Sequence, residues 1–325
     1  MLRAFACVFM VALLTSCAST SGSAPLSALS PQSPALPSSI ELNDVPFFPQ
    51  LIHQCGPAAL ATVLASAGIE VTPESLAEEI YIPKRKGSLQ PELIAAMRVR
   101  ERLPYVLDGK IDDVLAEVAA GRPVLVLQNL GLRHWPVWHY AVVVGYDIAQ
   151  DQMVLRSGKT QRLAMSAAEF ARTWDLAGRW AVIALSPGTG PVHADLQRYM
   201  NAAAPFEALG NVATAEQAYL YAREQWPEAA LPRLGLANIA QARGQLVEAQ
   251  RDYLEAIERD PSDPIARNNL AEILARRGCL GDARQEIQRA LELARGTAAE
   301  TLVRESAQEL ASSADSSSGS CFVTQ

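Results

Sequence analysis

Two residues have the chemistry of a thiol nucleophile and its base. These are Cys55 and His139, which lie 84 residues apart in the chain. A cysteine reacts as its thiolate, and a histidine within hydrogen-bond distance takes the thiol proton. Taken alone, a cysteine beside an apolar helix is usually a small core residue, and a single histidine is usually a hydrogen-bonded structural residue. The two form a candidate pair only if the fold brings them together.

A helix is predicted to begin at Cys55 and to end near Gly68. Pro57 suits the first turn, because the N–H that proline lacks has no helical partner there. Glycine is a common helix terminator, which places the end at Gly68. A thiol at the start of a helix meets unpaired N–H groups and the positive end of the helix dipole, and both favour the thiolate.

Two strands are predicted at residues 124–127 and 140–146, where β-branched and aromatic runs are bounded by Gly, Pro and Trp. His139 opens the second strand, a position that holds the backbone rigidly while the ring faces a cleft. His53 and His134 are rivals, but they lie in loops that orient a ring less firmly. His193 lies between the two bodies of the chain and is a poor candidate.

Four segments in order carry a family resemblance: QCGPAALATVL around Cys55, GRPVLVL, HYAVVVGYD from His139, and a later helix with Phe170 and Trp174. This order is similar to that of the bacteriocin-leader-processing (double-glycine) cysteine peptidases, a papain-like group of clan CA, family thirty-nine. The resemblance covers residues 45–185. It implies a papain-like domain in which Cys55 is the nucleophile and His139 is the base and later the acid.

The same family has a glutamine before the nucleophile that stabilises the oxyanion. We assign this role to Gln50, which precedes Cys55 by five residues where the family usually has six, so Gln54 stays open. The family also has an Asp or Asn, usually followed by Pro, that orients the histidine from the next strand. Here Ser157 and Gly158 stand at that place.

We assign Ser157 as the orienter of the imidazole. Its hydroxyl can accept a hydrogen bond from the ring, but it brings no charge to stabilise an imidazolium. The ion pair is therefore expected to be weaker than in the family. Asp147 and Asp151 lie nearby in sequence, and we expect them to point into solvent.

The N-terminus has the features of an exported lipoprotein. Arg3 precedes a short apolar run, and Leu14-Thr15-Ser16-Cys17 resembles a lipobox. This resemblance implies a signal peptide at residues 1–16 and lipids, including palmitate, on Cys17. Because Ala18 rather than Asp follows Cys17, it also implies the outer membrane, on its periplasmic face. Residues 17–43 predict a flexible linker.

A repeat with a period of 34 occupies residues 196–300. Gly210, Gly244 and Gly278 mark one column, and alanines 215, 249 and 283 mark another. This pattern is typical of tetratricopeptide (TPR) repeats. We predict three units at 196–229, 230–263 and 264–297, after a linker at 187–195 and before a helix end and Ser-rich tail at 301–325. Such repeats expose a concave surface that binds a peptide or a protein partner; the alternative is a structural cap.

Composition and the remaining motifs restrict the function further. The net charge of −7 and the lack of a long Lys/Arg run argue against a nucleic-acid partner. No spacing suggests a metal ligand set or a phosphate loop, so we expect no metal and no cofactor. Residues 84–86 predict a solvated basic loop or a contact for an acidic peptide. The loop before His139 contains Trp135, Pro136 and Trp138, which we expect either to line a substrate groove or to pack structurally.

Two further cysteines lie in or near the repeats. Cys279 is expected to be a packed thiol in the turn of the last unit, and Cys321 a free thiol in the tail that is able to form a disulfide.

The sequence as a whole predicts an α+β papain-like cysteine peptidase domain at residues 44–186, followed by an all-α TPR solenoid. The predicted function is cleavage of a peptide or protein by a lipid-anchored thiol protease whose repeats recruit the substrate or a partner. Two alternatives stay open. One is a peptidase-like scaffold that binds without cleaving, and the other is a different acyl transfer, such as amide cleavage in cell-wall peptides.

Overall fold

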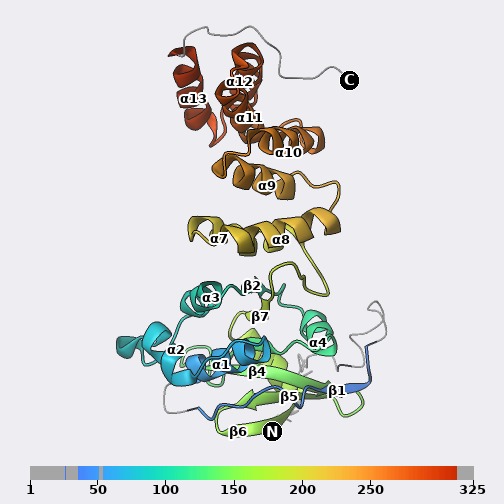
Figure 1. Ribbon diagram of the computed structural model, residues 1–325. Helices are drawn as coiled ribbons and strands as arrows, with labels where there is room; N and C mark the ends of the chain where they lie inside the picture. The colour runs from blue at the N-terminus through green and yellow to red at the C-terminus, as the bar shows by residue number, and fades with distance from the viewer. Residues whose placement is uncertain (1–25, 27–35, 51–53, 313–325) are drawn as a thin grey trace, which may run out of the picture.

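The computed structural model describes residues 26, 36–50 and 54–312. Figure 1 shows a sheet-containing body at one end and helices stacked in layers that lead away from it. The strands are β1 (Ser39–Glu41), β2 (Leu103–Val106), β3 (Val124–Asn129), β4 (Trp138–Asp147), β5 (Gln152–Ser157), β6 (Thr160–Ser166) and β7 (Ala181–Leu185). They form one sheet in the order β2-β7-β3-β4-β5-β6, with β1 added to β4, and every pairing is antiparallel.

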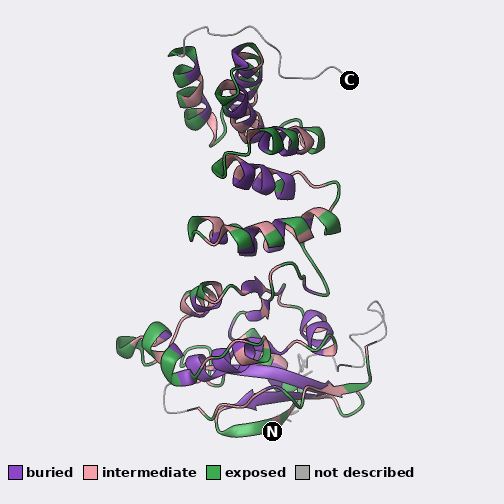
Figure 2. Cartoon of the chain, viewed as in Figure 1, coloured by how far each residue is buried: buried purple, intermediate pink, exposed green. Residues whose placement is uncertain are grey.

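Helices cover both faces of this sheet. They are α1 (Cys55–Ser66), α2 (Pro73–Ile80), α3 (Gln90–Val99), α4 (Ile111–Ala119) and α5 (Ala167–Asp175), with a 3-10 turn, η2, at Pro83–Arg85. One hydrophobic cluster joins α1, α2 and α3 to Leu125 and Val142, and a second joins α4 and α5 to Val126 and Val143. The central strands β3 and β4 are thus buried on both faces (Figure 2). This explains why they read as continuous apolar runs rather than as alternating ones.

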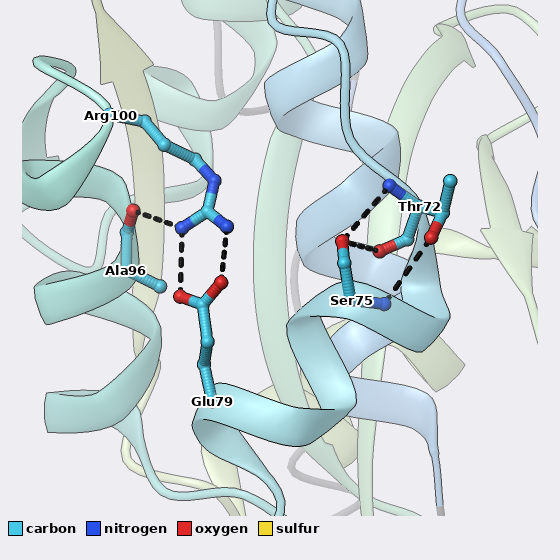
Figure 3. A network of polar contacts seen from close by, with 5 residues as sticks. All are labelled: Thr72, Ser75, Glu79, Ala96 and Arg100. Atoms are coloured by element: carbon cyan, nitrogen blue, oxygen red, sulfur yellow. Dashed lines mark hydrogen bonds and ion pairs between the residues drawn. The ribbon is translucent and has the colours of Figure 1, made fainter.

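A network of polar contacts fixes α2 and α3 relative to each other (Figure 3). Thr72 and Ser75 cap the start of α2 reciprocally. Arg100, just after α3, donates two hydrogen bonds to the Glu79 carboxylate of α2 and one to the carbonyl of Ala96. These hydrogen bonds hold the pKa of Glu79 below its usual range. The contacts therefore tie the end of α2, where the connecting segment 81–89 begins, to the end of α3.

The second body consists of helices packed in antiparallel pairs. They are α6 (Leu196–Ala203), α7 (Pro205–Ala208), α8 (Val212–Gln225), α9 (Leu231–Ala242), α10 (Leu246–Arg259), α11 (Pro264–Arg276), α12 (Leu280–Ala294) and α13 (Glu300–Ser312). Gly210, Gly244 and Gly278 lie in the turns that join the helices of each pair, all with positive φ. The alanine column at 215, 249 and 283 is fully buried, as expected where paired helices touch. The α+β body followed by a helical solenoid is the predicted fold class.

The two bodies share one hydrophobic core. The cluster on the α4 and α5 side of the sheet continues through Tyr199, Phe206 and Tyr219 of the first repeat helices. The predicted linker is packed against both bodies: the Val192 N–H donates to Glu117 at 2.6 Å, and the Tyr199 hydroxyl donates to the carbonyl of Thr189 at 2.9 Å. The repeats are therefore docked on the sheet body.

The structure corrects the prediction for Cys279, and several other predictions concern residues that it does not describe. Cys279 is buried and disulfide-bonded, so the expectation of a packed free thiol is wrong. The signal peptide, Cys17, most of the linker that follows it and Cys321 lie outside the described residues. Within 26, 36–50 and 54–312, no helix combines the length and the apolar character needed to cross a bilayer.

The shared core predicts that the two bodies unfold together. We expect a single cooperative thermal transition by circular dichroism, and Phe206→Ala should destabilise it by about 3–5 kcal/mol, the usual cost of deleting a buried phenyl ring. Leu209→Ala is the matched control, because Leu209 is 55% exposed. Two separate transitions in the unmodified protein would contradict the shared core.

Candidate active site

Cys55 is the first residue of α1, as predicted. Gln54 precedes it without a side-chain cap, and the first helical hydrogen bond runs from Ala58 N–H to the Gln54 carbonyl at 3.2 Å. Gly56 allows the start of α1 to approach the segment after η2, because a Cβ at this position would lie 2.8 Å from Ser88 Oγ. The glycine is thus needed to seat the thiol beside this segment.

The thiol of Cys55 is in contact with backbone N–H groups but is mostly buried. The N–H groups of Tyr140, Gly56 and Cys55 itself lower its pKa, as the helix start predicts. Burial acts in the opposite direction and is the largest effect, so the pKa of Cys55 is raised above its ordinary value. The N–H groups at the helix start thus act in the expected direction, but burial outweighs them and favours the neutral thiol.

His139 is the second residue of β4, one position later than predicted. Its Nε2 lies 2.8 Å from Ser157 Oγ at the end of β5. Burial lowers the pKa of the ring, which favours neutral imidazole. The structure thus brings His139 and Ser157 together. The hydrogen bond engages Nε2, so Nδ1 is the ring nitrogen that does not bond Ser157.

The Cys55 thiol and the His139 imidazole both lie near the start of β4, but no hydrogen bond joins them in the described part of the chain. Cys55 contacts the N–H of Tyr140, the residue directly after His139. Trp138 and Tyr140 line a cleft with Cys55, and His139, which lies between them in β4, is not among the residues that line it. In the described part of the chain, the ring of His139 bonds Ser157 and not the sulfur.

Gln50 lies at the same place, with both its backbone and its side chain engaged. Its N–H donates to the carbonyl of Gly158 at 2.9 Å, and its Nε2 donates to the carbonyl of Tyr140 at 3.2 Å. The side-chain amide is therefore next to the Cys55 region but is bound to the main chain of β4. Gln54, the other candidate oxyanion donor, directly precedes the thiol.

The rival residues lie elsewhere. Asp147 ends β4 at its opposite end and accepts a hydrogen bond from the Gln150 N–H, and Asp151 accepts one from Leu26. His134 is in an exposed loop. His193 pairs with Asp113 at 2.8 Å, between the two bodies. His53 lies outside the described residues.

A cleft of about 560 Å³ opens beside Cys55. Its walls come from α1, the segment after η2, and the strands β3 and β4; the lining residues are Cys55, Arg85, Lys86, Gly87, Ser88, Leu89, Gln90, Leu127, Trp138, Tyr140 and Ala177. Trp138 lines the cleft, which is one of the two predicted alternatives. Trp135 is 75% exposed and does not line the cleft. Sequence reasoning missed Ser88 and Tyr140, and the only signal for Tyr140 was its position after His139.

The raised pKa of Cys55 predicts a pH profile for alkylation. Because the folded state favours the neutral thiol, the rate of Cys55 modification by iodoacetamide should be low at pH 7–8 and rise through pH 9 and above. Mass spectrometry of the Cys55 peptide measures this rate. The same peptide in the unfolded chain is the control and should react faster at pH 8. A native thiol that reacts at its full rate near pH 6 would contradict the neutral resting state.

Comparisons with known proteins match the two bodies of the chain separately. Residues 42–182 match the model of the Peptidase_C39 like family, and residues 234–299 match a tetratricopeptide repeat model. Among curated proteins, no relative matches the chain.

Two solved structures are similar to separate parts of the chain. A C39-like peptidase from Bacillus anthracis is 22% identical, covers 46% of this chain and 98% of its own, and has a TM-score of 0.38. The Yersinia enterocolitica type III secretion chaperone SycD, in complex with a peptide of the translocator YopD, is 22% identical, covers 37% of this chain and 95% of its own, and has a TM-score of 0.34. By its matched family models, this chain carries a Peptidase C39-like domain followed by tetratricopeptide repeats.

Proposed function

We propose that the protein is a cysteine peptidase in which Cys55 attacks a peptide carbonyl bound in the cleft. The observation that carries the proposal is the placement of the Cys55 thiol in the lining of the cleft, against the strand residue that follows His139. The hydrogen bond from His139 to Ser157 supports it, because it orients the ring that would serve as the base.

The proposed reaction begins from a neutral thiol and a neutral imidazole. With Nε2–H donating to Ser157 Oγ, Nδ1 carries the lone pair that accepts the thiol proton. The ring and the sulfur close on each other when substrate is bound, since catalytic hydrogen bonds often form only in the complex. Sulfur then bonds to the carbonyl carbon, His139 gives its proton to the leaving amine, and water hydrolyses the acyl-enzyme.

The oxyanion of the intermediate would be stabilised by the Cys55 N–H and by a side-chain amide. We assign the amide to Gln50, whose Nε2 must exchange its bond with the Tyr140 carbonyl for the oxyanion. Gln50 Nε2 would then donate one hydrogen bond to the oxyanion in place of the one it donates to the Tyr140 carbonyl. The repeats bind a protein or peptide, and we propose that they recruit the substrate.

A non-catalytic scaffold is the second candidate, and two observations favour it. His139 is oriented by a hydroxyl instead of a carboxylate, and its ring makes no hydrogen bond with the thiol among the described residues. In that case the cleft binds a peptide that it does not cleave.

Variants at the site separate these two functions. We expect Cys55→Ala to abolish cleavage of a mixed peptide library and His139→Ala to lower it by about 100-fold or more, the usual size of a general-base contribution. Cleavage products and the trapped acyl-enzyme are measured by mass spectrometry. Retention of cleavage in Cys55→Ala would refute the peptidase, and peptide binding without any cleavage by the unmodified protein would support the scaffold.

Substitution of Ser157 tests the orienter. Ser157→Asp places a carboxylate beside Nε2, which should raise the pKa of His139 by about one unit or more and increase the cleavage rate, because an opposite charge stabilises the imidazolium. Ser157→Ala, which removes the hydrogen bond, should lower the rate. The pH profile of kcat/KM measures both effects, and equal profiles in the two variants would contradict the assignment.

We also propose that the mature protein is anchored by lipid on Cys17, at the periplasmic face of the outer membrane. The lipobox sequence supports this location. Metabolic labelling with radioactive palmitate should mark the protein, and the label should be absent from Cys17→Ala. A labelled Cys17→Ala variant would place the lipid elsewhere.

A further inference from the structure

We infer that the cleft selects a peptide with an acidic side chain near the bond that Cys55 attacks. This inference rests on the proposed function and names the class of substrate. The observation that carries it is the presence of Arg85 and Lys86 in the lining of the same cleft as the nucleophile.

Both cations are free to bind a ligand. Arg85 and Lys86 are exposed, and among the described residues neither forms an ion pair or a side-chain hydrogen bond with the protein. Arginines elsewhere differ: Arg100, Arg162 and Arg243 each pair with a carboxylate. In a chain with 35 acidic and 28 basic residues, two unpaired cations in one cleft mark a local excess of positive charge. A carboxylate is the side chain that complements them.

The backbone that carries these cations is held in a specific conformation. Lys86 has φ of 50°, in the left-handed region that lysine rarely adopts, although a glycine follows it directly. The segment is closed by a bridge between Ile82 and Gly87, and the α2–α3 network ties the end of α2, where the segment begins, to the end of α3 (Figure 3). Strained backbone of this kind is typically found at binding sites. The backbone that carries the two side chains is thus fixed before a ligand arrives.

A hydrogen-bond donor lies on the same wall. Ser88 Oγ is inaccessible to solvent in this structure and has no hydrogen-bond partner, which is costly for a hydroxyl unless a ligand satisfies it. Ser88 Oγ is the atom that a Cβ at Gly56, the residue after the nucleophile, would approach most closely. Rotation of the Ser88 side chain toward the cleft would let a bound carboxylate or peptide carbonyl accept this hydrogen bond.

The other charges around the cleft leave the excess positive. Glu92 of α3 is close enough to Tyr140 to contribute to its raised pKa, but it does not line the cleft. The lining itself therefore carries two cations and no carboxylate. It also includes the apolar side chains of Leu127, Trp138 and Ala177. The cleft thus offers both a site for an acidic group and apolar surface.

Alkylating reagents that differ by one charge test this inference without requiring proteolysis. Two chloroacetyl-capped dipeptides, one with Asp and one with Asn beside the chloroacetyl group, are compared for their rate of Cys55 labelling at pH 9 by mass spectrometry. Both react with the same thiolate, so the ratio of the two rates removes the effect of the cysteine pKa. We expect the Asp reagent to react about threefold faster or more, the size of one or two exposed ion pairs.

Substitutions and salt then locate the charge. In Arg85→Gln/Lys86→Gly the ratio should fall to about one, and glycine at position 86 suits the positive φ, so the variant should keep its fold. Lys84→Gln is the matched control, because Lys84 is the neighbouring cation that does not line the cleft, and the ratio should stay unchanged. High salt should lower the ratio in the unmodified protein.

The outcomes distinguish this inference from the proposed function. Equal rates for the two reagents in the unmodified protein, or a ratio that the double substitution leaves unchanged, would overturn the acidic preference even if peptides are cleaved. A ratio that depends on Arg85 and Lys86 in a protein that cleaves nothing would support the acidic ligand and refute the peptidase.

Discussion

The site depends on the packing of α1 against β4. Leu60 and Leu64 of α1 meet Val142 and Val144 of β4 in one fully buried cluster. Each such side chain contributes about 1.5–3 kcal/mol when it leaves water. This packing fixes the distance between the helix start and the strand start, and it thereby places the Cys55 thiol on the N–H of Tyr140.

The same packing opposes the ionisation of the nucleophile. A helix start stabilises a thiolate through its N–H groups, but only if the sulfur stays near water or meets a cation. Here the sulfur is buried deeply enough for desolvation to exceed three backbone N–H contacts. His139 is neutral for the same reason, and its partner Ser157 offers no charge. If the protein is the peptidase we propose, activation would therefore accompany substrate binding, when the proton moves from the neutral thiol to the neutral imidazole.

The continuous core between the bodies limits how the repeats can act. Tyr199 packs with Trp226, and its cluster extends to the buried face of the sheet. Repeats joined only by a flexible linker would search a large volume for their partner. Repeats docked through a shared core keep one orientation relative to the cleft. Under the proposed function, recruitment would therefore depend on geometry as well as on local concentration.

The elements of the fold were predictable from local patterns. The period of 34, the helix start at Cys55 and the apolar runs at 124–127 and 140–146 depend on residues close in sequence, and the structure has an element at each place. The partnership of Ser157 with His139 was expected from the family resemblance, and the structure brings the two side chains together because adjacent antiparallel strands place residues 18 apart at the same end of a sheet.

Only the tertiary structure decided the protonation of the site and the composition of its walls. Whether the helix end or burial controls the Cys55 pKa depends on how much of the chain covers the sulfur, which no local pattern reports. Arg85, Lys86 and Ser88 line the same cleft as Cys55 because α2 and α3 pack against α1. The amino-acid sequence determined which groups are present and which elements carry them. Long-range packing determined their solvation and their neighbours, because desolvation and contact both depend on residues distant in sequence.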